Sequence, residues 1–230
     1  MILALPPQCL TIVSMSGAHA VGKTTLVQDL VATLIGQGYS AVPVGSFSAS
    51  LFNRLCAAHP EIRGYDDIDA QGHRGWFQRN LPEACAAAVE RAALSLNCAM
   101  RQRVLLADRW FPDILAHTMV ASPKDAALQS QVSFLCTSRH RKLHATLRDR
   151  YGLTREINVL VPLSSVRFDV PKSADKFRAT HSQESIEREC VDCWPRTMSS
   201  APHLKITESS RTGRVKQVLQ ALVSFTPKEQ

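Results

Sequence analysis

The residues best suited to chemistry lie near the N-terminus, where glycine, lysine and threonine recur at a fixed spacing. Gly17, Gly22, Lys23 and Thr24 fit the pattern GxxxxGK[ST]. In a loop of this kind the glycines permit backbone angles that a side chain would forbid, so that N–H groups point inward and bind an anion. The lysine supplies positive charge to the β- and γ-phosphates, and the threonine hydroxyl reaches Mg²⁺. The pattern therefore predicts a site for a nucleoside triphosphate and Mg²⁺.

The sequence on either side of this motif agrees with a P-loop, which needs a strand before it and a helix after it. Residues 10–15 form a short apolar run typical of a buried parallel strand. From 23 to 35 the apolar residues recur on one helical face. A GTP-binding switch is not favoured, because the chain has no Asn-Lys-x-Asp sequence to bind guanine. The residues predicted to bind ATP are Gly17, Ala18, His19, Ala20, Val21, Gly22, Lys23, Thr24 and Thr25, and Arg211 is expected to pack near the adenine.

A second reactive pair follows a later strand, predicted at residues 104–107, which ends at Asp108 and Arg109. The carboxyl ends of parallel strands lie at one edge of a sheet, so Asp108 is expected beside the P-loop. A carboxylate there can hold Mg²⁺ together with Thr24, or accept the proton of an attacking hydroxyl. Arg109 can bind the acceptor or a phosphate. The alternative is that Asp108 only caps the next helix.

The remaining elements alternate between strand and helix. Further strands are predicted at 41–44, 157–161 and 204–207, and helices at 76–100, 113–120, 124–150, 182–194 and 212–225, whereas 46–75 is expected to be irregular. Short strands alternating with helices predict a parallel sheet joined by right-handed crossovers. We therefore expect a single α/β domain over 1–230, a three-layer P-loop NTPase fold with a five-stranded parallel sheet, helices on both faces and a small helical lid.

The P-loop combined with Asp108-Arg109 at a strand end resembles the nucleoside and nucleotide kinases, thymidylate kinase among them. Residues 107–117, ADRWFPDILAH, look like the version found in phage and bacterial P-loop kinases. In that group a polar segment after the fourth strand forms a mobile lid, which residues 175–180 resemble, within a lid of about 166–194. A lid arginine brings positive charge to the phosphoryl group only when the lid closes. The alternative is that the basic residues of this segment are only solvated charges on a loop. The resemblance implies that Lys23, Asp108, Arg109 and Arg178 are catalytic, with Lys176 a second lid candidate, and that Thr24 and Asp108 bind the metal.

The phosphate acceptor is less well defined by the sequence. Thymidylate kinases carry an arginine just after the second strand, for the acceptor's phosphate, but residues 45–50 contain none. The formal charge is +7, from 27 Lys and Arg against 20 Asp and Glu, which favours a polyanionic partner. The basic segment 139–150 can follow a phosphate backbone, and Phe47, Trp76 and Phe77 can stack on a base, although a solvated helix face and core aromatics are the simpler interpretations.

Three hypotheses for the function remain open at this point. The leading one is an ATP-dependent kinase of 5-hydroxymethyl-2′-deoxyuridine in phage DNA, as in the group resembled. The first alternative is a kinase of a free nucleoside, a nucleoside monophosphate or another small metabolite. The second alternative is a P-loop ATPase coupled to a DNA-binding partner.

The sequence also predicts where the protein resides. The first ten residues are apolar but lack a basic flank and are interrupted by Pro6-Pro7, and no apolar run approaches the roughly 20 residues of a membrane helix. The seven cysteines, an odd number, are typical of reduced thiols, and the Cys190–Cys193 pair is expected to be structural. We therefore expect a cytoplasmic protein with no membrane partner, in the host cytoplasm if it is viral.

Overall fold

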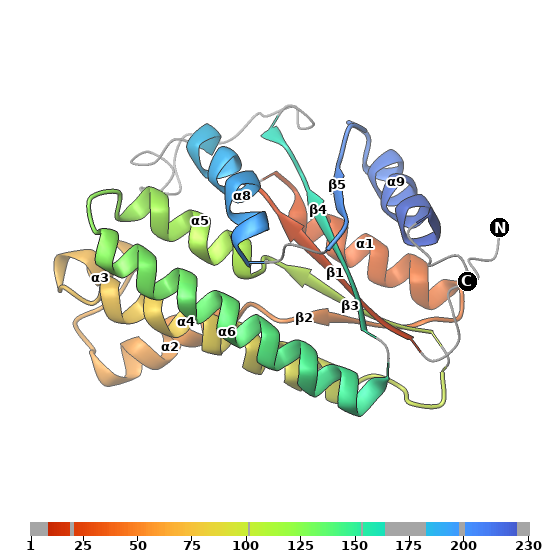
Figure 1. Cartoon of the computed structure of the whole chain (residues 1–230), viewed down its shortest axis with the longest axis horizontal. Coiled ribbons are helices and arrows are strands. Elements are labelled where there is room, and N and C mark those ends of the chain that lie inside the picture. Colours follow the sequence, from red (N-terminus) through yellow and green to blue (C-terminus); the bar gives the residue numbers. More distant parts are fainter. Residues whose placement is uncertain are drawn as a thin grey trace.

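The computed structural model describes residues 9–18, 21–100, 102–152, 154–163, 183–197 and 201–224. Within these residues the chain forms a five-stranded sheet in which every pair of neighbouring strands is parallel. The strands are β1 (Cys9–Ser16), β2 (Ser40–Val44), β3 (Gln102–Asp108), β4 (Thr154–Leu160) and β5 (His203–Lys205), in the order β2-β3-β1-β4-β5 (Figure 1). The predicted five-stranded parallel sheet is confirmed.

Helices cover both faces of the sheet and make a three-layer fold (Figure 1). One face carries α1 (Lys23–Gly36) and α9 (Arg211–Ser224). The other carries α2 (Phe47–Ala58), α3 (Tyr65–Ala70), α4 (Arg74–Leu94), α5 (Phe111–Ala121), α6 (Ala126–Tyr151) and α8 (Gln183–Thr197). Among the described residues, no helix combines the length and the apolar character that crossing a membrane would need.

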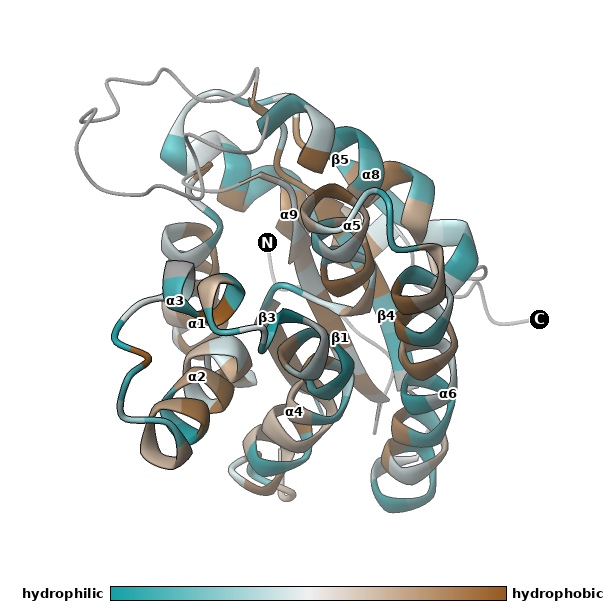
Figure 2. Cartoon of the chain, turned by 90° about the vertical axis from the view of Figure 1, so that its left-hand side faces the viewer, coloured by the Kyte–Doolittle hydropathy of each residue, from teal (hydrophilic) through white to brown (hydrophobic). Residues whose placement is uncertain are grey.

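The core lies on both sides of the sheet because successive strand side chains point to opposite faces. On β1, Leu10 and Ile12 pack into the cluster beneath α4, α5 and α6, whereas Val13 and Met15 pack into the cluster beneath α1 and α9. A strand buried on both faces is apolar along most of its length, which explains why β1 could be predicted. Along α6 hydrophilic and hydrophobic residues alternate turn by turn, as expected of a helix with one buried face (Figure 2).

The prediction that residues 46–75 are irregular was wrong, because this stretch contains α2 and α3. Ser46 caps α2 by accepting a hydrogen bond from a backbone N–H of its first turn. Phe47, Leu51 and Leu55 follow at helical spacing and are buried. These helices form one side of the cavity described below, so the error hid part of the site.

The segment predicted as a lid, about 166–194, lies partly outside the described residues. Lys176 and Arg178 fall in the part that is not described, so their role stays a prediction. The described part belongs to α8, which packs against α5 and α6. Cys190 and Cys193 are both fully buried there, as expected of structural cysteines.

Candidate active site

The predicted phosphate-binding loop joins the carboxyl end of β1 to the start of α1. Gly17 has a φ of 134°, and a Cβ at this position would lie 2.5 Å from the carbonyl oxygen of Val161. Gly22 has a φ of 85° and caps α1. Both angles lie in the left-handed region that favours glycine, so the backbone requires both glycines of the motif. Of the other residues predicted to bind ATP, Ala18 and Val21 are buried, Thr25 is exposed in the first turn of α1, and His19 and Ala20 lie outside the described residues.

Lys23 is the buried charge of this loop. Its Nζ donates hydrogen bonds to the carbonyl oxygens of Gly17, at 3.0 Å, and of Ala18. Burial, assisted by the positive charge of Arg109, lowers the pKa of Lys23 from 10.5 to about 8, although nearby carboxylates act in the opposite sense. A bound phosphate would supply the negative charge that this buried ammonium favours.

Thr24 and Asp108 meet at the edge of the sheet, as the sequence predicted. Asp108 ends β3 and pairs in register with Met15 of β1, immediately before the loop. The hydroxyl of Thr24 donates a hydrogen bond to the carboxylate of Asp108. Hydroxyl and carboxylate oxygens are the ligands that Mg²⁺ prefers, so these two side chains fit the predicted metal site.

Arg109 adopts an unusual backbone conformation next to this pair. Its φ is 95°, the only positive φ among the described non-glycine residues. The backbone N–H of Arg109 donates to the carbonyl oxygen of Met15 at 3.0 Å, and its guanidinium contacts Nε2 of His117. Left-handed angles in residues with a side chain cluster at functional sites. Here the angle turns Arg109 from the end of β3 into the wall of a cavity.

Asp113, a buried carboxylate at the start of α5, was not predicted from the sequence. It accepts hydrogen bonds from Ser16 Oγ at 2.6 Å, from the N–H of Trp110 at 3.1 Å and from the N–H of Gly17 at 3.3 Å. Burial raises its pKa, whereas the positive charge of Lys23 acts to lower it. Asp113 therefore ties the P-loop to the segment that carries the Asp-Arg pair.

A cavity of about 330 Å³ opens beside Arg109 and Asp113. It lies between α2, α3, α4 and α5, and its size is within the range of small-molecule sites. Aromatic rings dominate one side: Tyr65 meets Phe77 edge to face, with centroids 6.0 Å apart, and Phe47 lies nearby. Besides Arg109 and Asp113, the polar side chains around it are Ser48, Asp69, Arg74, Gln78, His117 and Thr118.

The other aromatic and basic residues proposed for acceptor binding lie elsewhere. Trp76 is on the same helix as Phe77 but is 38 % exposed and does not line the cavity. Arg148 and Arg150 occupy the last turn of α6, just before β4 begins. They therefore lie at the amino ends of the strands, opposite the P-loop.

Arg214 of α9 approaches the P-loop, although the sequence suggested Arg211 instead. A guanidinium nitrogen of Arg214 donates to the carbonyl oxygen of Val21 at 3.3 Å. Arg211 makes two 2.6 Å hydrogen bonds to Asp29 on α1. The two arginines are only three positions apart at the start of α9, so the sequence alone does not show which one faces the P-loop.

The parallel sheet, the helices on both of its faces and the P-loop after β1 together define a three-layer α/β P-loop fold. No protein-family model matches the sequence, and no curated protein does. Among solved structures, a NadR protein in complex with NR matches with a TM-score of 0.59 and 13% identity over 96% of this chain and 52% of that chain. The chain therefore spans about half the length of that protein. Thymidylate kinase from Ehrlichia chaffeensis matches with a TM-score of 0.50 and 12% identity over 93% of this chain and 98% of that chain.

Proposed function

We propose that this protein is an ATP-dependent kinase that transfers the γ-phosphate to a hydroxyl of a small nucleoside-like acceptor. The observation that carries the proposal is the aromatic cavity beside Arg109, next to the contact between Thr24 and Asp108. The cavity offers the rings of Phe47, Tyr65 and Phe77 to a planar acceptor and the guanidinium of Arg109 to a polar group of that acceptor. The likeness to a NadR protein in complex with NR and to a thymidylate kinase accords with an acceptor of this size.

In the proposed reaction a new bond forms between the acceptor oxygen and the γ-phosphorus, while the bond from that phosphorus to the β-γ bridging oxygen breaks and ADP leaves. Lys23 and the loop N–H groups bind the phosphates, and Arg109 binds the acceptor or the transferring group. Asp108 accepts the proton of the attacking hydroxyl. Mg²⁺ bound by the hydroxyl of Thr24 would neutralise phosphate charge.

We propose a free small molecule as the acceptor, in place of 5-hydroxymethyluracil in DNA. The DNA hypothesis depended on a basic segment and on stacking residues, and the folded chain favours neither as a DNA-binding surface. The basic end of α6 lies at the opposite end of the strands from the P-loop. The proposed stacking residues Phe47 and Phe77 are buried, at 4 % and 8 % exposure, and line a cavity of small-molecule size. No specific observation favours an ATPase coupled to a DNA-binding partner.

A transfer assay tests the proposal directly. The chain is incubated with Mg²⁺ and ATP labelled at the γ-phosphate, in the presence of a panel of nucleosides, nucleoside monophosphates, or DNA containing 5-hydroxymethyluracil. Label is expected in a free nucleoside or nucleotide. Label in DNA alone would replace the acceptor proposed here, and release of free phosphate with no labelled acceptor would contradict a kinase.

Removing one ring from the cavity should weaken acceptor binding without affecting ATP. Phe77→Leu keeps an apolar side chain but loses the aromatic face, and a stacked base contributes roughly 1–3 kcal/mol in related sites. We expect the KM for the acceptor to rise by on the order of 10-fold, with the KM for ATP unchanged. Trp76→Leu is the matched control, because this neighbouring ring lies outside the cavity and should leave both constants unchanged.

ATP binding should take up protons near pH 8. Because the pKa of Lys23 is about 8, about half of the free chains carry a neutral amine at that pH. Phosphate oxygens beside Nζ raise this pKa, so the amine becomes protonated in the complex. Calorimetric titrations in buffers of different ionisation enthalpy should show an uptake of about half a proton at pH 8, growing toward about pH 9 and fading toward about pH 7. Absence of any uptake across this range would contradict the lowered pKa.

A further inference from the structure

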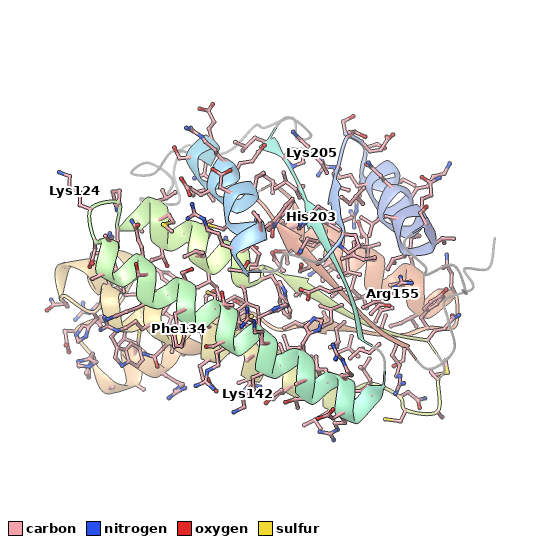
Figure 3. The ribbon with its side chains drawn as sticks, viewed as in Figure 1. Lys124, Phe134, Lys142, Arg155, His203 and Lys205 are labelled. Atoms are coloured by element: carbon pink, nitrogen blue, oxygen red, sulfur yellow. The ribbon has the colours of Figure 1, made fainter. Side chains whose placement is uncertain are left out.

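Two histidines of α6 and one glutamate of β4 form a compact group away from the nucleotide site. His140 and His144 are four residues apart, so they share one face of the helix. Both Nε2 atoms lie within hydrogen-bonding distance of the same carboxylate oxygen of Glu156, at 2.8 and 2.6 Å. Lys142, between them in the sequence, is exposed and points away from the sheet (Figure 3).

Glu156 is a buried carboxyl group. Its side chain is only 4 % exposed, whereas those of His140 and His144 are 12 % and 21 % exposed. A buried carboxylate requires partners that replace its lost contact with water, and either imidazole N–H groups or a metal ion can supply them.

Surrounding side chains hold Glu156 and His140 in place, as outer groups do around metal ligands. The other carboxylate oxygen of Glu156 accepts a hydrogen bond from Nε1 of the fully buried Trp110. The ring of His140 lies edge to face against Phe111, with centroids 5.5 Å apart, and its centroid is 4.7 Å from that of His144. The carboxylate of Glu156 and the ring of His140 are therefore oriented by groups outside the three.

We propose that His140, His144 and Glu156 bind a zinc ion. Their three ligand atoms lie within 4.8 Å of one another, and two imidazoles with one carboxylate are a donor set that zinc accepts. Ligand atoms about 2.0 Å from a tetrahedral zinc are about 3.3 Å apart. The present separations of 2.6 and 2.8 Å from Glu156 would therefore widen by about 0.5–0.7 Å on binding. The exposed edges of the two histidines give the ion a path of entry.

Such an ion would have a structural role rather than a catalytic one. It would join α6 to β4 and fix Glu156, whose other oxygen holds Trp110. Trp110 directly follows Arg109 and precedes the helix that carries Asp113. The metal would thus stabilise the segment on which the candidate active site depends, from outside that site.

Two other histidine groups provide comparisons. His203 of β5 is close enough to Glu156 for that carboxylate to influence the pKa of the histidine (Figure 3). The ring of His203, however, stacks on Trp194 with the two centroids 4.3 Å apart, and His203 is not one of the three clustered ligands. His59 and His73 form a second candidate group with Glu61, at the protein surface. This second group is a suitable control because it has the same ligand types and greater exposure.

Zinc uptake by the full chain tests the proposal. The protein is stripped with a chelator, incubated with zinc, separated from free metal, and analysed by mass spectrometry. The double variant His140→Gln/His144→Gln removes both imidazoles but keeps amide N–H groups that can bond to Glu156, so its fold should survive. His59→Gln/His73→Gln is the matched control. Thermal unfolding with and without zinc is measured for all three proteins.

We expect one zinc per chain in the wild type and in the control, with a zinc-dependent rise in Tm, and a loss of affinity on the order of 100-fold or more in the double variant. Cobalt in place of zinc should give visible d–d bands without a sulfur-to-cobalt charge-transfer band. A wild type that takes up no zinc, or a double variant that binds it equally well, would overturn the proposal. A sulfur charge-transfer band would assign the metal to cysteines and overturn it too.

Discussion

Lys23→Met should reduce phosphoryl transfer by on the order of 10³-fold while the protein remains folded. The ammonium of Lys23 is the buried charge of the P-loop, held over the loop by the carbonyl oxygens of Gly17 and Ala18. In related sites this ammonium lies beside the transferring phosphoryl group, which carries negative charge in the transition state. Loss of the ammonium therefore weakens stabilisation of the transition state as well as ATP binding. Methionine fills a similar apolar volume without the charge.

The free energy of unfolding gives an independent measure of the effect of Lys23→Met. The pKa of Lys23 is lowered from 10.5 to about 8 in the folded chain, so between these values the unfolded chain binds more protons. The free energy of unfolding of the wild type should therefore rise relative to Lys23→Met as the pH increases from about 8 to about 10.5, by up to about 3 kcal/mol. Chemical denaturation of both proteins across this range measures the difference.

An exposed lysine serves as the control for charge in general. Lys142→Met removes the same charge from the surface of α6 and should leave transfer unchanged (Figure 3). Transfer at the wild-type rate in Lys23→Met, in a protein with a native circular dichroism spectrum, would refute the nucleotide site itself.

The parts of the site that could be predicted are those that local sequence determines. Gly17 and Gly22 were identifiable because their backbone angles forbid most side chains, and Lys23 and Thr24 because they follow at fixed spacing. Asp108 was identifiable because a buried strand must end where its apolar run ends. The fold followed from the alternation of short strands and helices, which restricts the topology to a few possibilities.

The parts that were missed depend on contacts between distant residues. Asp113 looks like an ordinary acidic residue in the first turn of a helix, and only folding brings it to Ser16, 97 positions earlier. The HxxxH spacing of His140 and His144 is present in the sequence, but it lies in a basic helix and acquires a partner only when β4 places Glu156 opposite. A pattern within one helix cannot reveal a ligand supplied by a strand.

The cavity was missed for a related reason. Phe47, Trp76 and Phe77 were proposed from the sequence as stacking residues. Of these, Trp76 lies outside the cavity, and Tyr65, which lines it, was not proposed. The residues that form the cavity come from four helices, and two of those helices were expected to be irregular. A cavity between helices depends on how those helices pack, so neither its volume nor its lining follows from the spacing of aromatic residues.

Asp108→Asn should lower kcat by on the order of 10²–10⁴-fold with little change in the KM for ATP. The side chain keeps its shape, and its amide oxygen can still accept the hydrogen bond from Thr24, so the local structure should persist. What is lost is the negative charge that accepts the proton of the attacking hydroxyl. Steady-state kinetics with the acceptor and with ATP varied in turn measure both constants.

The dependence on Mg²⁺ separates the two roles open to Asp108. If its carboxylate acts as the base, kcat stays low at every Mg²⁺ concentration, because added metal does not replace a proton acceptor. If it serves only as a ground-state metal anchor, excess Mg²⁺ restores much of the rate, and the loss appears in the KM for ATP. Asp192→Asn, an exposed carboxylate on α8, should change neither constant. We expect the first pattern, since Thr24 provides a metal ligand that survives the substitution, whereas Asp108 is the carboxylate that ends β3 directly beside the P-loop.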